Sequence, residues 1–295
     1  MAFGHIALGQ IIVNWLLLGG LYAAVALGFS LIWGIMNIVN LAQGSLIIVG
    51  AYAAFVAFSR FHIDPFVGIL VSMAVLFIIG WVIQYVAINR VIRAPFLVTF
   101  MLTFGLDLLI TDLVQLFFTT DLRSINTAYS GAGLTLGSTR IPYDRVGILF
   151  VAILLTWALS QFLSRTRTGN AILATGMDRD AARLMGVNIA NIYALTFAIG
   201  AALAGAAGAM LAQVYPFAPS DSGTYTLNAF VIVVLGGLGT PWAALAGGML
   251  FALAQTALPL LPGVGPGYEN VIAFGVLVLV LIVRPSGLLG KAFYA

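Results

Sequence analysis

Two carboxylates inside one apolar stretch are the residues that most clearly suggest chemistry. Asp107 lies near the centre of residues 95–118, and Asp112 follows five residues later. An ionised carboxylate in an apolar span is costly, so it should face other helices or a cavity and have a function. Thr103 and Thr111 lie four residues to either side of Asp107, on the same helical face, where they could hydrogen-bond it. The pair predicts either a proton relay or a helix–helix contact, and the absence of a buried cation favours the contact.

Polar or glycine-rich breaks interrupt two other apolar stretches, within residues 37–45 and 236–241. A helix that starts inside a membrane presents N–H groups and positive dipole character to an anionic ligand. Broken helices in corresponding places of two halves mark the midplane site of many transporters. We therefore expect substrate to be bound by residues of the two breaks and of the Asp107 face: Asn37, Asn40, Gln43, Ser45, Thr103, Asp107, Gly236, Gly237, Gly239 and Thr240. The alternatives are an ordinary polar connection and a packing bend.

Residues 164–190 form the most polar stretch between two apolar ones. They include Arg165, Arg167, Arg179 and Arg183, four of the chain's 12 basic residues. The stretch is too long for a simple turn, and its alanines and leucines favour helix between punctuating glycines. An amphipathic helix here would suit docking onto a soluble partner. The alternative is a basic loop that only fixes topology.

These features lie in a strongly apolar chain, in which 62% of the 295 residues are hydrophobic and only 7% are charged. Soluble domains carry about 25% charged residues. A lipid-covered chain must satisfy its own backbone, and continuous apolar runs of about 20 residues favour helices over a barrel. We predict a single all-α domain over 1–295, a polytopic transmembrane bundle of eight or nine spans with discontinuous helices and an internal repeat. The candidate spans are 8–34, 38–58, 66–89, 95–118, 146–163, 191–212, 228–258 and 269–283.

The basic residues orient this bundle. The positive-inside rule places 164–190 in the cytoplasm, and the N-terminus and residues 120–145 outside. A cytoplasmic C-terminus then requires 228–258 to cross the membrane twice. Because the basic residues are spread over short loops, they indicate topology and exclude a nucleic-acid stripe.

Several kinds of chemistry are excluded by residue type. The chain has no cysteine, its two histidines (His5 and His62) are far apart, and its one lysine is Lys291. No metal site, cofactor site, phosphate-binding loop or catalytic constellation is therefore predicted. If transport consumes ATP, another subunit must hydrolyse it.

Four segments resemble the branched-chain amino acid ABC permeases, in particular the shorter of their two permease subunits. They are Gly34 to Ser45, Thr168-Gly with Asp178 to Val187 and Leu195 to Gly205, Phe230 to Thr240, and Val283 to Leu288. One such match is unspecific, but four in this order cover nearly the whole chain. Leu173, Asp107 and Asp112 depart from the pattern expected of the family.

The resemblance implies a multi-pass subunit of a bacterial-type cytoplasmic membrane. It implies three kinds of protein partner: cytoplasmic ATPases, a second permease in a hetero- or homodimer, and an extracytoplasmic binding protein. The chain would also be in contact with membrane lipid. Residues 120–145 and 213–228 would receive the binding protein. Related systems carry branched-chain or other amino acids, amides or urea. The ATPase contact would comprise Thr168, Gly169, Asp178, Arg179, Ala181, Ala182, Arg183 and Gly186.

Three other classes of function are compatible with the residues alone. A stand-alone secondary transporter would use Asp107 and Asp112 as a proton relay, and a channel would need no energy source. An intramembrane enzyme fits least, because no nucleophile–base pair or metal constellation is present.

Overall fold

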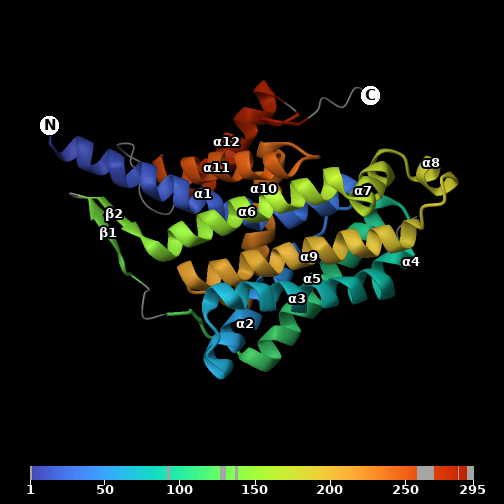
Figure 1. The fold of residues 1–295 in the computed structure, drawn as a ribbon, viewed down its shortest axis with the longest axis horizontal. Helices are drawn as coiled ribbons and strands as arrows, with labels where there is room; N and C mark the ends of the chain where they lie inside the picture. The colour runs from blue at the N-terminus through green and yellow to red at the C-terminus, as the bar shows by residue number, and fades with distance from the viewer. Residues whose placement is uncertain are drawn as a thin grey trace.

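A computed structural model describes residues 2–91, 94–126, 131–136, 139–257, 269–284 and 286–290. Nearly all of its regular structure is helical (Figure 1). The elements are α1 (Ala2–Met36), α2 (Gln43–Phe61), α3 (Pro65–Ile83), η1 (Gln84–Ile88), α4 (Asn89–Val91), α5 (Phe96–Phe118), β1 (Gly133–Leu136), β2 (Thr139–Pro142), α6 (Tyr143–Arg165), α7 (Arg167–Met177), α8 (Arg179–Leu184), α9 (Ile189–Val214), η2 (Pro219–Asp221), α10 (Ser222–Gly236), α11 (Pro241–Ala257) and α12 (Glu269–Val283).

The predicted polytopic all-α bundle is confirmed, whereas the predicted count of eight or nine spans is not. Six helices are long and apolar enough to cross a membrane, and η2–α10 and α11 form a pair bent by 110° that would make a seventh. The described part of α12 has only 15 residues, shorter than the roughly 20 that a span needs. The eight or nine spans expected from the sequence are therefore not all present as full-length helices in the described residues.

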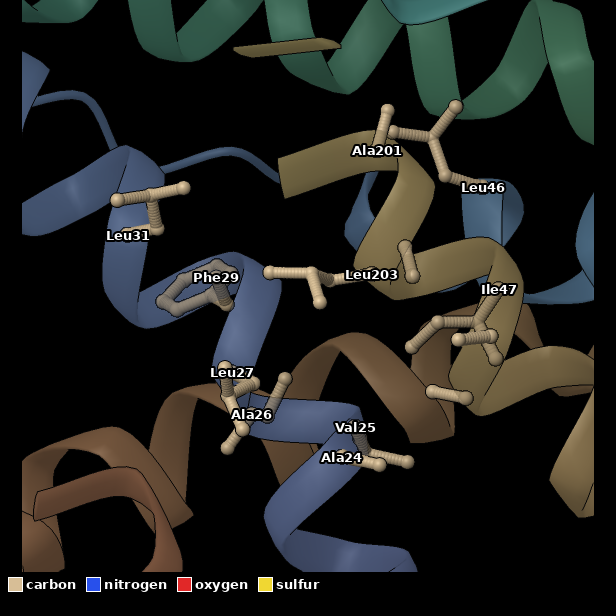
Figure 2. Close-up of a cluster of buried hydrophobic side chains, with 14 of the residues drawn as sticks. Ala24, Val25, Ala26, Leu27, Phe29, Leu31, Leu46, Ile47, Ala201 and Leu203 are labelled. Carbon is tan, nitrogen blue, oxygen red and sulfur yellow. The ribbon is translucent and has the colours of Figure 1, made fainter. Parts of the chain in front are cut away.

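The centre of the bundle is built from α1, α2 and α9. In α9, 89% of an apolar stretch of 18 residues is buried, against 17% of a stretch of the same length in α5. Figure 2 shows side chains of α1, α2 and α9, among them Phe29, Ile47 and Leu203, meeting in this core. Small residues permit the close packing: a Cβ added to Gly208 would lie 1.9 Å from the carbonyl oxygen of Ile47.

A β-hairpin and the helices α7 and α8 lie at opposite ends of the bundle (Figure 1). Strands β1 and β2 pair antiparallel. The side chain of Gln10 in α1 receives a hydrogen bond from the Arg140 backbone N–H at 2.8 Å and donates one to its carbonyl at 3.2 Å. The sequence did not predict this hairpin, which lies within the loop expected outside the membrane.

Candidate functional site

The first break turns the chain between α1 and α2. Asn37 has a left-handed φ of +54° directly after the end of α1, and the side chain of Asn40 is fully buried. The Oδ1 atom of Asn40 accepts a hydrogen bond from the Ala42 N–H at 3.2 Å, an interaction that stabilises a turn over helix. A Cβ added to Gly28 would meet the Gln43 side chain at 3.2 Å. Helix α2 therefore begins inside the bundle, beside the body of α1.

Side chains from other helices occupy the start of α2. The Gly44 N–H donates to Oγ1 of Thr226 in α10 at 2.9 Å, and that hydroxyl donates to the carbonyl of Leu41 at 3.0 Å. The carboxylate of Asp107 in α5 lies near the side chain and the backbone N–H of Ser45, which can both donate to it. Of the N–H groups that the sequence suggested would be open to an anion, those of Gln43 and Gly44 therefore already have partners within the protein.

The predicted common face of Thr103, Asp107 and Thr111 is confirmed, although the two hydroxyl groups bond elsewhere. The Thr103 hydroxyl lies 3.2 Å from the carbonyl oxygen of Val39, and the Thr111 hydroxyl lies 3.2 Å from Oγ of Ser222. This face of α5 packs on the first break and on α10. Asp112 lies on the exposed side of α5, so the two carboxylates have different surroundings.

Two buried polar atoms at the start of α2 have no hydrogen-bond partner among the described residues. They are Oδ1 of Asp107, an acceptor when ionised, and Nε2 of Gln43, a donor. Buried polar atoms are rarely left unpaired, because each loses its bonds to water. One donor and one acceptor beside the same helix start can bind the carboxylate and the ammonium of a zwitterion.

The second break has different neighbours. Gly237 and Gly239 have φ of +95° and +107°, and Thr240 accepts the Ala243 N–H at 3.2 Å to cap α11. The carbonyls at the end of α10 accept N–H groups of Leu288 and Leu289, both at 2.9 Å. The C-terminal segment therefore satisfies the carbonyl groups at the start of the second break. Beside it is a narrow cleft lined by the ends of α1 and α6, by α7 and by the break: Leu27, Ser30, Leu31, Gly34, Ile35, Leu159, Leu163, Leu173, Gly239, Thr240 and Pro241.

The segment 164–190 folds into two short helices, as its composition indicated. Thr166 accepts the Gly169 N–H at 2.9 Å, and Asp178 accepts the N–H groups of Asp180 and Ala181, both at 2.9 Å. These side-chain caps explain where α7 and α8 begin. A Cβ added to Gly176 would lie 3.1 Å from the Ile35 side chain, so α7 is seated on the last turn of α1.

Most of the predicted docking residues are exposed. Gly169 and Ala182 are buried, whereas the other six lie at the surface: Thr168, Asp178, Arg179, Ala181, Arg183 and Gly186. Three large apolar side chains that were not predicted as docking residues project beside them: Met177, Leu184 and Met185 are 86%, 88% and 84% exposed. The sequence feature that could have indicated them is the presence of large apolar residues within a charged segment. Exposed apolar side chains of this kind suit contact with a protein partner.

The comparisons with known proteins decide the family. The family described as the permease component of the branched-chain amino acid transport system matches residues 11–281. The chain belongs to this permease family. The permease is 31% identical over 295 residues to BraD of Pseudomonas aeruginosa, which covers 96% of the chain and 95% of BraD. It is 30% identical over 301 residues to LivH of Escherichia coli K12, with the same coverages.

A second kind of permease is also similar. LivM of Escherichia coli K12 is 35% identical over 154 residues, which are 50% of this chain and 35% of LivM. No solved structure matched the chain significantly. The permease is thus of the LivH type, and its apolar helices make it a multi-pass protein of the inner membrane. Both breaks, α5 and the helices α7 and α8 lie within the matched region.

Proposed function

We propose that this permease is the membrane-spanning subunit of an ABC importer for branched-chain or related amino acids. The observation that carries the proposal is the similarity, over 96% of the chain, to proteins named as permeases of high-affinity branched-chain amino acid transport systems. Separate ATPase subunits would supply the energy, an extracytoplasmic binding protein would deliver the cargo, and a second permease would complete the pore. The hairpin end of the bundle, within residues 120–145, would receive the binding protein.

The cargo would be held at the first break. Nε2 of Gln43 can donate to the cargo carboxylate, and Oδ1 of Asp107 can accept from its ammonium. Asn37, Asn40, Ser45 and Thr103 would shape this site. The glycines of the second break, with Thr240, would line the route beside the end of α1. We count six long helices, the bent pair and α12 as membrane segments, which gives eight, or nine if the pair crosses twice.

The contact of α7 with α1 supports an alternating-access mechanism. Helix α7 packs on the last turn of α1, and the second break lies beside the same turn. A movement of α7 would therefore displace both the end of α1 and the second break. Rigid groups of helices would then rock about the site at the start of α2. The push would come from ATPases bound to the exposed residues of α7 and α8.

Combining Arg183→Ala with Gly186→Val should uncouple transport from ATP hydrolysis. Arg183 is exposed at the end of α8, and Gly186 has a φ of +83° that strains any other residue. We expect ATP-driven uptake to fall at least tenfold while the complex still assembles and hydrolyses ATP. Radiolabelled uptake and phosphate release in proteoliposomes measure both, with Arg60→Ala as the control for a lost surface charge. Unchanged uptake would remove the coupling role from this surface.

Reconstitution separates the importer from its rivals. We expect uptake of a branched-chain amino acid only when the purified permeases, ATPases and binding protein are combined with ATP. If the chain alone drives uptake from a proton gradient, it is a secondary transporter that uses Asp107 and Asp112. Flux without either energy source would indicate a channel.

A further inference from the structure

Helix α5 has one face packed on the protein and a broad face exposed. The packed face carries Thr103, Asp107 and Thr111, described above. The exposed side contains a stripe that we call the α5 outer stripe: Met101, Gly105, Leu108, Asp112 and Leu116. Met101, Leu108 and Leu116 are 56%, 50% and 77% exposed, and a Cβ added to Gly105 would meet no atom within 4 Å. In Figure 1, α5 reaches the lower edge of the bundle.

Asp112 makes this stripe unlike a lipid-facing surface. Asp107 and Asp112 are the only charged residues beyond the first and last turns of the six long helices. Asp112 lies six residues before the end of α5. At 1.5 Å per residue, it is therefore about 9 Å from that end along the helix axis. Long basic side chains can reach the membrane surface from such a depth, but aspartate is too short. A carboxylate facing hydrocarbon there is costly.

The exposed faces of other peripheral helices lack this feature. On α3 the exposed side chains include Val67, Leu70 and Ile78, at 51%, 65% and 63%, and no charged residue lies beside them. Those faces suit lipid. In the described part of the chain, no ion pair or hydrogen bond compensates the charge of Asp112. The described residues therefore leave the α5 outer stripe uncovered and the charge of Asp112 without a compensating group.

We propose that the α5 outer stripe is the surface on which a second, non-identical permease packs, with a cation or hydrogen-bond donor of that subunit opposite Asp112. The inference rests on the proposed function, which requires a second permease. Gly105 allows a partner helix to approach closely, as small residues do in membrane interfaces. An unlike subunit is favoured because a two-fold contact between identical stripes would bring two Asp112 carboxylates together.

Photo-crosslinking in the native membrane tests this surface. Benzoylphenylalanine replaces Met101, Leu108 or Leu116 in the tagged chain, and Val67, Leu70 or Ile78 of α3 in the controls. We expect adducts with a different permease of the same family, identified by mass spectrometry, at least tenfold more abundant from α5 than from α3. Equal adducts from α3, adducts with another copy of this chain, or only lipid adducts from α5 would each overturn the inference.

Two further measurements keep the outcomes separate. If no second permease co-purifies with the unmodified chain, the proposed function fails; if one co-purifies but α5 gives no adduct, only the inference fails. Asp112→Leu should reduce recovery of the second permease at least fivefold, whereas the neighbouring Leu113→Ala should preserve it. Recovery that is unchanged or increased with Asp112→Leu is the behaviour of a lipid-facing position and would overturn the inference.

Discussion

Gly44→Ala should severely destabilise the permease. A Cβ at this position would lie 1.8 Å from the carbonyl oxygen of Ser222 and 2.6 Å from Oγ1 of Thr226. The first atom belongs to the backbone of α10 and can move only with the helix, so α2 and α10 must separate. Separation also breaks the 2.9 Å bond from the Gly44 N–H to Thr226. Overpacking costs up to about 3 kcal/mol, and a buried donor left unpaired adds about 1–3 kcal/mol.

The measurement is thermal unfolding of the detergent-solubilised protein, followed by fluorescence-detected size exclusion. Gly223→Ala is the matched control, because Gly223 follows Ser222 and a Cβ there would meet no atom within 4 Å. We expect Gly44→Ala to be recovered mostly as aggregate and Gly223→Ala to match the unmodified protein. Normal recovery of Gly44→Ala would mean that α2 and α10 are not in contact at this point.

Much of this architecture could be predicted from the sequence, because it depends on local pattern. Segment 95–118 became α5 (Phe96–Phe118), and the four-residue spacing of Thr103, Asp107 and Thr111 placed them on one packed face. Glycine and proline marked the end of α10 and the start of α11. The basic segment became α7 and α8, whose caps Thr166 and Asp178 are local in sequence.

The remaining features depend on partners far apart in the chain. Thr226 reaches the Gly44 N–H across 182 positions, and Leu288 caps the end of α10 with its own backbone. No local pattern reveals which N–H groups of a broken helix are already bonded. The hairpin was missed for a similar reason, since its four-residue strands are short and are held against α1 by Gln10.

Asp107 could also be placed on a packed face from spacing, but its task could not be deduced. Two tasks remain compatible with its position. As a structural cap it would only hold the start of α2, through the side chain and N–H of Ser45. As a cargo ligand it would also use Oδ1, which is buried without a partner among the residues described. Charge separates the two tasks, since a neutral amide can still accept the Ser45 N–H.

Asp107→Asn should therefore retain the fold and lose transport. Asparagine keeps an acceptor for Ser45, but it lacks the negative charge that would bind an ammonium, and such charge-assisted bonds are about twice as strong as neutral ones. We expect the thermal midpoint to stay within about 3 °C, a shift that corresponds to about 2 kcal/mol for a chain of this length, while KM for uptake rises at least tenfold. Asp107→Leu, which leaves the Ser45 N–H unpaired, should lose both stability and uptake. Asp112→Asn is the matched control and should change KM less than twofold. If Asp107→Asn transports as well as the unmodified permease, the carboxylate is only a cap for α2, and the cargo ammonium is bound elsewhere.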